Sequence, residues 1–143
     1  MVEVADARSA MATQSRFPSA DKVTVAQTAT AADVALDPWT VAVIMTHRYR
    51  DDVELLKALL PRELSYLGLL GPKKRAVKIL AELAVSKFKV TTKMLARLHA
   101  PVGLDLGGDG PAPVALAMLA EIQSVLAARD ARPLRERKRP IHA

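Results

Sequence analysis

A threonine and a histidine directly follow the most apolar segment of the chain. Residues 41–45 (VAVIM) form a continuous apolar run, typical of a strand covered on both faces in a parallel sheet. Thr46 and His47 would then lie at the carboxyl end of that strand, where open α/β sheets bind ligands. The imidazole could transfer a proton or bind an oxyanion or a metal, although no nucleophile or second metal ligand has a telling spacing. A hydrogen-bonded structural histidine explains the residue equally well.

Glycines and cations follow the next apolar segment, residues 64–70 (LSYLGLL), which is also strand-like. They lie at the end of this strand and in the first turn of a predicted helix: Gly68, Gly71, Lys73, Lys74 and Arg75. Free N–H groups at a helix N-terminus bind anions, and neighbouring cations strengthen the field. Cations at this end oppose the helix dipole, so we expect a phosphate contact here in preference to a merely solvated turn.

Three further residues are weaker candidates for ligand binding. Asp6 ends a short β-prone segment, where the acid of a dinucleotide-binding domain accepts hydrogen bonds from ribose hydroxyls. One acid is only a fragment of that fingerprint, and a cap or turn residue is the commoner role. Gly103 and Asp105 indicate a tight loop ahead of the last helix, in which Asp105 could ligate or cap.

The predicted secondary structure alternates strands with helices. Strand-like segments are 2–6, 22–26, 41–45, 64–70 and, as a strand or extended segment, 99–106. Helices are predicted at 29–36, after Asp51 or Asp52 as the cap, from Pro72 as the first helical residue to 84, at 91–98 and after residue 108. This order predicts an α/β fold, a parallel sheet with helices on both faces.

The last helix is unusually apolar. Residues 114–120 are apolar on every side, which indicates that the helix is buried deeply or packs against a partner. Glu121 is the only charged residue between positions 114 and 128. A solvent-facing acid is the commoner explanation for it, and an acid that faces a pocket or partner is the alternative.

Bulk composition narrows the function classes. The 143 residues are 50% hydrophobic and 25% charged, which fits one folded domain, residues 1–128. Without cysteine the chain can have no disulfide, thiolate nucleophile or cysteine-ligated zinc, and it fits a reducing, cytoplasmic compartment. No apolar run approaches the ~20 residues that cross a bilayer, so no membrane partner is expected. Aromatic residues make up only 3% of the chain, so few side chains could stack on nucleobases. Much of the +6 charge lies in a basic tail, residues 129–143, which we expect to be disordered. For both reasons no nucleic-acid partner is expected.

Four stretches together resemble the C-terminal Rossmann-like domain of the XdhC/CoxF family, the xanthine dehydrogenase accessory proteins. They occur in the family's order: 6–8 with 16–21 (DAR, RFPSAD), 45–52 (MTHRYRDD), 66–75 (YLGLLGPKKR), and 100–107 (APVGLDLG) with 119–122 (LAEI). Arg48 stands where the family usually has aspartate, and residues 110–113 (GPAP) replace its usual TPEE. Compared with the family, the chain begins at the second strand and lacks the first strand and its glycine-rich loop. Segments 2–6 and 41–45 must then pair directly or leave two open edges.

The resemblance implies a chaperone-like accessory protein rather than an enzyme. It would bind the molybdenum cofactor (molybdopterin) and help insert it into an enzyme of the xanthine dehydrogenase or carbon monoxide dehydrogenase type. The protein is also expected to form a homodimer. The implied cofactor-binding residues are Asp6, Thr46, His47, Gly68, Gly71, Lys73, Lys74, Arg75, Gly103 and Asp105. Two alternatives stay open: an oxidoreductase-like Rossmann domain that uses NAD(P) or another nucleotide, and a non-functional fragment.

Overall fold

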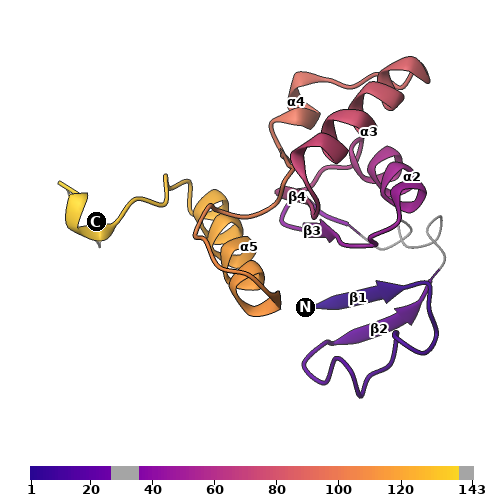
Figure 1. Cartoon of the computed structure of the whole chain (residues 1–143), viewed down its shortest axis with the longest axis horizontal. Coiled ribbons are helices and arrows are strands. Elements are labelled where there is room, and N and C mark those ends of the chain that lie inside the picture. Colours follow the sequence, from indigo (N-terminus) through magenta and orange to yellow (C-terminus); the bar gives the residue numbers. More distant parts are fainter. Residues whose placement is uncertain (27–35, 139–143) are drawn as a thin grey trace.

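The computed structural model describes residues 1–26 and 36–138 of the chain (Figure 1). Its strands are β1 (Glu3–Asp6), β2 (Lys22–Val25), β3 (Val41–Ile44), β4 (Tyr66–Leu69) and β5 (Leu98–His99). Its helices are α2 (Tyr49–Leu59), α3 (Lys73–Val85), α4 (Thr92–Leu95) and α5 (Pro111–Leu126), followed by a 3-10 turn (Leu134–Glu136). The helix predicted at 29–36 falls, apart from Leu36, outside the described residues.

The strands form two parallel sheets, β1-β2 and β3-β4-β5. In the larger sheet Val41 pairs with Tyr66 and Ile44 with Leu69, which confirms the predicted parallel pairing of these two apolar segments. Within the described residues β1 and β3 do not pair with each other, so each keeps one open edge. This is the second of the two arrangements expected from the sequence.

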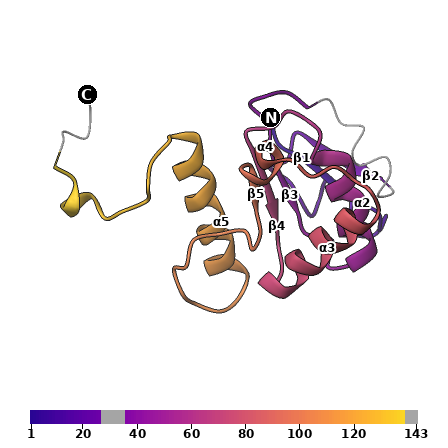
Figure 2. The same cartoon turned by 90° about the horizontal axis from the view of Figure 1, so that it is seen from above.

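Helices pack against both faces of the larger sheet. Leu67 and Leu69 point to one face, where α2 and α3 complete a core of buried aliphatic residues, among them Leu56, Ile79 and Leu83. Burial of these apolar side chains is the main source of the domain's stability. Side chains alternate along a strand, so Tyr66 points to the opposite face, where its hydroxyl contacts Glu121 of α5. Helix α5 lies on the other side of the sheet from α2 and α3 (Figure 2). The predicted α/β fold is therefore confirmed.

Two predicted helix starts are corrected by the structure. Helix α2 begins at Tyr49 with Arg48 in the N-cap position, so neither Asp51 nor Asp52 is the cap. Both acids instead lie in the first turn, where a negative charge stabilises the positive end of the helix dipole. Pro72 is the N-cap residue of α3 rather than its first helical residue.

The predicted helix 91–98 is shorter than expected. It spans Thr92–Leu95, capped by the hydroxyl of Thr91, which accepts a hydrogen bond from the Met94 N–H at 3.3 Å. Leu98 belongs to β5, because Leu67 of β4 pairs with it. Of the extended segment predicted at 99–106, only His99 lies in a strand.

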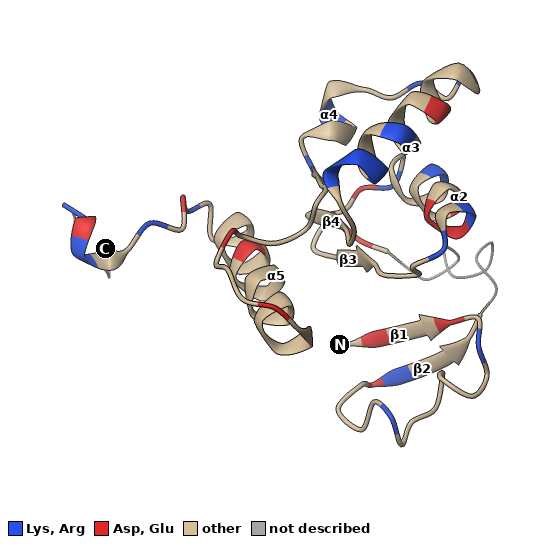
Figure 3. Cartoon of the chain, in the orientation of Figure 1, with Lys and Arg blue, Asp and Glu red and all other residues tan. Residues whose placement is uncertain are grey.

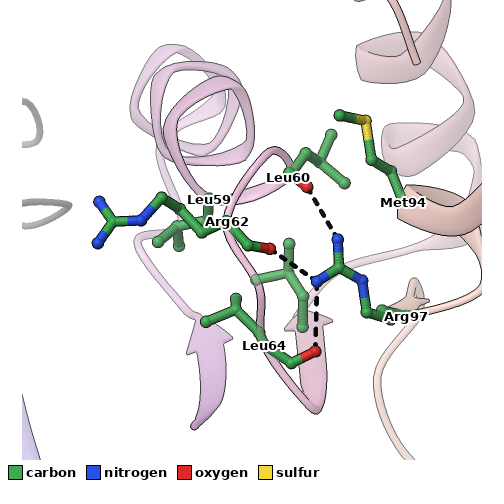
Figure 4. A pocket seen from close by; sticks show the side chains of 7 residues that line it. Leu59, Leu60, Arg62, Leu64, Met94 and Arg97 are labelled. Atoms are coloured by element: carbon green, nitrogen blue, oxygen red, sulfur yellow. Dashed lines mark hydrogen bonds between the residues drawn. The ribbon is translucent and has the colours of Figure 1, made fainter. Parts of the chain in front are cut away.

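Arg97 closes the turn between α2 and β4 (Figure 4). Its guanidinium donates hydrogen bonds to the carbonyl oxygens of Arg62 at 2.7 Å, Leu60 at 3.2 Å and Leu64 at 3.3 Å. The depression lined by these residues and Met94 has no space for a water molecule. Arg97 therefore satisfies carbonyl groups that follow the end of α2, and this depression is not a ligand site.

Helix α5 departs from the expectation of deep burial. None of its residues is buried, and Leu116 and Leu119 are 61% and 65% exposed. Its contact with the sheet is made to β4, and the rest of the helix projects from the body in both views (Figures 1 and 2). No helix in residues 1–26 and 36–138 is long and apolar enough to span a membrane.

Candidate functional site

The carboxyl ends of β3 and β4 form one common rim. The Leu70 N–H donates a hydrogen bond to the Ile44 carbonyl at 3.0 Å, so the two strands end side by side. Thr46 and His47 leave the first strand there, and Gly71 leaves the second. The structure thus brings these predicted residues to the same edge of the sheet, where parallel α/β sheets bind ligands.

A buried carboxylate joins the two halves of this rim. Asp52 of α2 is only 1% exposed, and its Oδ1 accepts a hydrogen bond from the Thr46 hydroxyl at 2.5 Å. Its Oδ2 lies 2.5 Å from Nη2 of Arg75, in the first turn of α3. Thr46 and Arg75 therefore both contact Asp52, which the sequence predicted only as a helix cap. A buried carboxylate needs such a counter-charge, because an unpaired charge is costly to remove from water.

Arg75 points into the protein rather than towards solvent. Its contact with Asp52 is an ion pair of poor hydrogen-bond geometry, since Oδ2, Nη2 and Nε have no well-aligned hydrogen-bond partner. Gly71 makes room for it: a Cβ at Gly71 would lie 3.2 Å from the Arg75 Cδ, and the Gly71 φ of +143° disfavours any side chain. The outward cations of the rim are then Lys73 and Lys74, which are both exposed.

His47 occupies a strained backbone conformation at the rim. Its φ is +58°, a left-handed value that costs a non-glycine residue about 1–3 kcal/mol. The turn around it is held by Thr46, whose hydroxyl accepts a hydrogen bond from the Arg48 N–H at 3.1 Å. The exposed imidazole is thereby presented at the end of β3. Strain of this kind is common at binding sites, where the surrounding contacts maintain it.

The N-terminus of α3 has the features of an anion site. Its N-cap, Pro72, makes no side-chain cap hydrogen bond, and no acid lies in the first turn. The exposed Lys73 and Lys74 therefore add their charges to the positive end of a 13-residue helix (Figure 3). The arrangement can bind a phosphate or carboxylate, because free N–H groups and ammonium groups lie together.

Asp6 and Gly68 have local partners. Asp6 ends β1 and accepts hydrogen bonds from Arg8 Nε at 2.9 Å and Nη2 at 2.7 Å. These hydrogen bonds lower the pKa of Asp6 to about 2, with a smaller contribution from the charge of Arg48. Gly68 lies inside β4, where an added Cβ would stand 2.8 Å from the Val102 side chain, so close packing explains this glycine.

A second polar cluster, not predicted from the sequence, lies on the other face of the sheet. The Tyr66 ring stacks on His99 with centroids 4.2 Å apart, and the Tyr66 hydroxyl donates a hydrogen bond to Glu121 of α5. The same carboxylate accepts a hydrogen bond from the Gly103 N–H at 2.8 Å and lies 3.3 Å from His99 Nδ1. The expectation that Glu121 faces solvent is therefore wrong. A lone charge in an otherwise apolar helix was the sequence signal for this cluster.

Burial and hydrogen bonding act together on this cluster. Burial, followed by the hydrogen bond to Glu121, raises the pKa of Tyr66 well above its ordinary value. Burial also works to raise the pKa of Glu121, but the hydrogen bonds from Tyr66 and Gly103 outweigh it and the pKa is lowered. Tyr66 thus stays neutral and Glu121 ionised, which anchors α5 to β4.

The remaining predicted residues lie in the loop ahead of α5. Gly103 adopts a φ of +109° and serves the Glu121 anchor, whereas Asp105 is exposed in the same loop. Among residues 1–26 and 36–138, no three histidine, aspartate or glutamate side chains gather as metal ligands. The best-formed candidate site is therefore the rim of β3 and β4 beside the N-terminus of α3.

Comparison with known proteins identifies the family. Residues 1–122 match the family described as the XdhC Rossmann domain. The chain is 32% identical over 122 residues to a Bacillus subtilis protein named as a probable subunit of xanthine dehydrogenase. It is 34% identical over 111 residues to the uncharacterized protein YqeB of Escherichia coli. These alignments cover 85% and 76% of this chain.

A solved structure agrees with the sequence comparison. The crystal structure of a xanthine dehydrogenase from Bacillus halodurans superposes with a TM-score of 0.75 at 30% identity, covering 92% of this chain. The chain spans only 38% of that protein, 34% of the Bacillus subtilis relative and 20% of the Escherichia coli relative. Because sequence and fold agree over most of its length, the chain belongs to the XdhC family and carries that family's Rossmann domain.

Proposed function

We propose that this chain is an accessory protein of a xanthine-dehydrogenase-type molybdoenzyme, and that its β3–β4 rim binds the phosphate end of molybdopterin. The observation that carries the proposal is the pair Lys73 and Lys74 at an uncapped helix N-terminus beside His47 and Gly71. The names of the two Bacillus relatives, which both refer to xanthine dehydrogenase, support the class of partner.

The residues at the rim fit the phosphate part of the cofactor. Lys73 and Lys74 would hold the phosphate with their ammonium groups, and the free N–H groups of the first turn of α3 would donate to its oxygens. Thr46 would keep the neighbouring turn in place through Asp52. When bound, the cofactor supplies the molybdenum redox chemistry of the client enzyme. The role of this chain is to hold and orient the cofactor.

We expect the site to bind the cofactor without catalysing a reaction, because the acids near His47 are already paired with arginines. Asp51 forms an ion pair with Arg48, and Asp52 forms one with Arg75. Both carboxylates that lie nearest to His47 in the sequence are thus neutralised by arginine, so neither is a free general base. His47 could donate a hydrogen bond to a bound anion without any further catalytic partner.

Retention of molybdopterin by the purified chain tests the proposal. The chain is mixed with isolated molybdopterin, passed through gel filtration, and the retained pterin is measured by fluorescence. Charge reversal in Lys73→Glu combined with Lys74→Glu should weaken binding by ten-fold or more, equivalent to about 1.4 kcal/mol. Lys89→Glu, an exposed lysine beyond α3, is the matched control and should bind like the parent chain.

Three results would contradict the proposal. The first is no retention of pterin by the parent chain, and the second is an equal loss of binding in the Lys89→Glu control. The third is tight binding and reduction of NAD with a substrate, which would establish the oxidoreductase alternative. Docking is tested separately by co-sedimentation with a xanthine-dehydrogenase-type apoenzyme.

A further inference from the structure

Three buried atoms beneath the β3–β4 rim have hydrogen-bonding capacity left over. They are Oδ2 of Asp52 and the Nε and Nη2 atoms of Arg75. The Asp52 side chain is only 1% exposed, whereas the Arg75 side chain is 21% exposed and so reaches the surface along part of its length. Buried polar groups of folded proteins are nearly always paired, so these atoms mark a place where a further group completes the hydrogen bonds.

Gly71 leaves space in front of one of these atoms. An added Cβ at Gly71 would lie 4.0 Å from Nε of Arg75. Apart from the glycine's own neighbours in the chain, no other residue in the described part comes within 4 Å of that position. An N–H···O hydrogen bond spans about 2.9 Å, so a ligand oxygen has to lie only about 1 Å closer to Nε than this Cβ would. The space at Gly71 therefore suits an acceptor oxygen.

Asp52 fixes the guanidinium beside this space. Its Oδ2 lies 2.5 Å from Nη2 of Arg75, and its Oδ1 accepts a hydrogen bond from the Thr46 hydroxyl at 2.5 Å. An arginine side chain has several rotatable bonds, so an unpaired guanidinium samples many orientations and extends its head into water. The carboxylate, itself held by Thr46, restricts the guanidinium to one orientation.

We propose that Asp52 is a positioning residue for anion binding. It orients Arg75 so that the Nε–H donates, across Gly71, to an oxygen of a bound phosphate-type oxyanion. This inference rests on the proposed function, because it concerns the same rim. The oriented donor adds to the N–H groups at the start of α3 and to the ammonium groups of Lys73 and Lys74, which lie in its basic first turn (Figure 3).

This role explains why an acid is buried beside an anion site. The carboxylate of Asp52 cancels the charge of Arg75, so the pair as a whole adds little net attraction for an anion. What the pair contributes is the direction of one N–H group. Hydrogen bonds from a charged donor to an anion are strong and depend on geometry, so a fixed direction improves binding.

Charge and orientation predict opposite results for Asp52→Asn. The change removes a negative charge beside the site, so electrostatics alone would tighten anion binding. If Asp52 orients Arg75, the change frees the guanidinium, and we expect the dissociation constant to rise about five-fold through loss of one charged hydrogen bond. The sign of the effect therefore separates the two explanations.

Arg75→Lys separates charge from orientation in a second way. Lysine keeps the positive charge but has no Nε–H in a planar guanidinium, so the two residues are not interchangeable where direction matters. Electrostatics alone predicts unchanged binding, whereas the proposal predicts a rise of about five-fold in the dissociation constant. The double variant Asp52→Asn with Arg75→Lys should bind no more weakly than Arg75→Lys, because both changes remove the same donor.

Calorimetric titration of the full chain with pyrophosphate measures these dissociation constants. Glu82→Gln is the matched control, because it removes a negative charge of α3 whose partner is Tyr49, at 2.8 Å, and not Arg75. It should bind pyrophosphate at least as tightly as the parent chain. The Nε–H signal of Arg75, identified by its loss in Arg75→Lys, should shift on titration in the NMR spectrum of the parent chain and not in that of Asp52→Asn.

A second pair of variants covers the case in which Asp52→Asn does not fold. Thr46→Val removes the hydroxyl that holds Asp52 and leaves every charge in place. It should weaken pyrophosphate binding by about two- to three-fold, a smaller loss because the ion pair remains. Thr46→Ser keeps the hydroxyl and should bind like the parent chain. Equal binding by both variants would contradict the proposal.

The outcomes distinguish this inference from the proposed function. Tighter binding by Asp52→Asn, unchanged binding by Arg75→Lys, or an Arg75 Nε–H signal that ignores pyrophosphate overturns the role of Asp52. The proposed function then stands if molybdopterin is still retained through Lys73 and Lys74. Conversely, an Arg75-dependent pyrophosphate site in a chain that does not retain molybdopterin supports the role of Asp52 and overturns the proposed function. A parent chain that binds no pyrophosphate overturns the inference.

Discussion

Helices α3 and α5 are attached to the same sheet in different ways. Helix α3 buries Ala76, Ile79 and Leu83 in the apolar core. Helix α5 has no buried residue and is held through the carboxylate of Glu121. Apolar packing and a polar anchor thus stabilise two neighbouring parts of one small domain.

The two helix N-termini differ as much as the two attachments. At α3 the first turn carries lysines and free N–H groups. At α5 Pro111 and Pro113 have no N–H to donate, and the first turn carries no acid. The difference favours anion binding at the start of α3 over the start of α5.

The largest expected effect is the loss of stability when a buried leucine of α3, rather than an exposed leucine of α5, is shortened to alanine. Leu83→Ala should reduce the free energy of unfolding by about 2–5 kcal/mol, because Leu83 is fully buried and a cavity is left. Leu119→Ala, at an exposed position, should change it by less than about 0.5 kcal/mol in the monomer. Urea denaturation at a low protein concentration measures both, and equal losses would remove the distinction.

Removing the buried carboxylate of the rim should cost nearly as much. In Asp52→Asn the Arg75 guanidinium loses its counter-charge, so we expect a destabilisation of about 3 kcal/mol. The double variant Asp52→Asn with Arg75→Met removes both charges and should be more stable than the single variant. Urea denaturation compares the two, and a double variant that is no more stable than Asp52→Asn alone would contradict the ion pair.

Removing the polar anchor should have a smaller and local effect. Glu121→Ala leaves the Tyr66 hydroxyl and the Gly103 N–H without their acceptor, at a cost of about 1–3 kcal/mol. Amide hydrogen exchange should accelerate in α5 and remain slow at Ile79 and Leu83 of α3. Uniform acceleration in both helices would show that α5 is part of the main cooperative unit.

The smallest effect is the acid sensitivity of the anchor. The pKa of Glu121 is lowered in the folded chain, so its contribution is present above the ordinary value of 4.5 and is lost as the pH falls through the lowered value. The Gly103 amide proton reports this ionisation by NMR, and its midpoint should lie below 4.5. Glu121→Gln should abolish the transition, whereas a midpoint above 4.5 would contradict the anchor.

The sequence predicted those parts of the fold that depend on local patterns. The apolar runs at 41–45 and 64–70 identified the parallel strands, and the spacing of apolar residues in 72–84 identified α3 within one residue at each end. Thr46, His47 and Gly71 were correctly placed at one edge, because parallel neighbours end on the same side.

The missed features depend on contacts between distant residues. Asp52 was interpreted as a cap, because its partner Arg75 is contributed by another helix. Glu121 was assigned to solvent, because Tyr66 is 55 residues away in the sequence. The apolar pattern of α5 predicted deep burial or packing against a partner, yet none of its residues is buried, because periodicity alone does not state which surface covers a helix.

An NMR titration with pyrophosphate tests the contrast between the two helix N-termini most directly. The account predicts saturable shifts of the amide signals of His47, Gly71, Lys73 and Lys74, with none at the start of α5. Shifts centred on Val114, or no saturable shift at the β3–β4 rim, would contradict it.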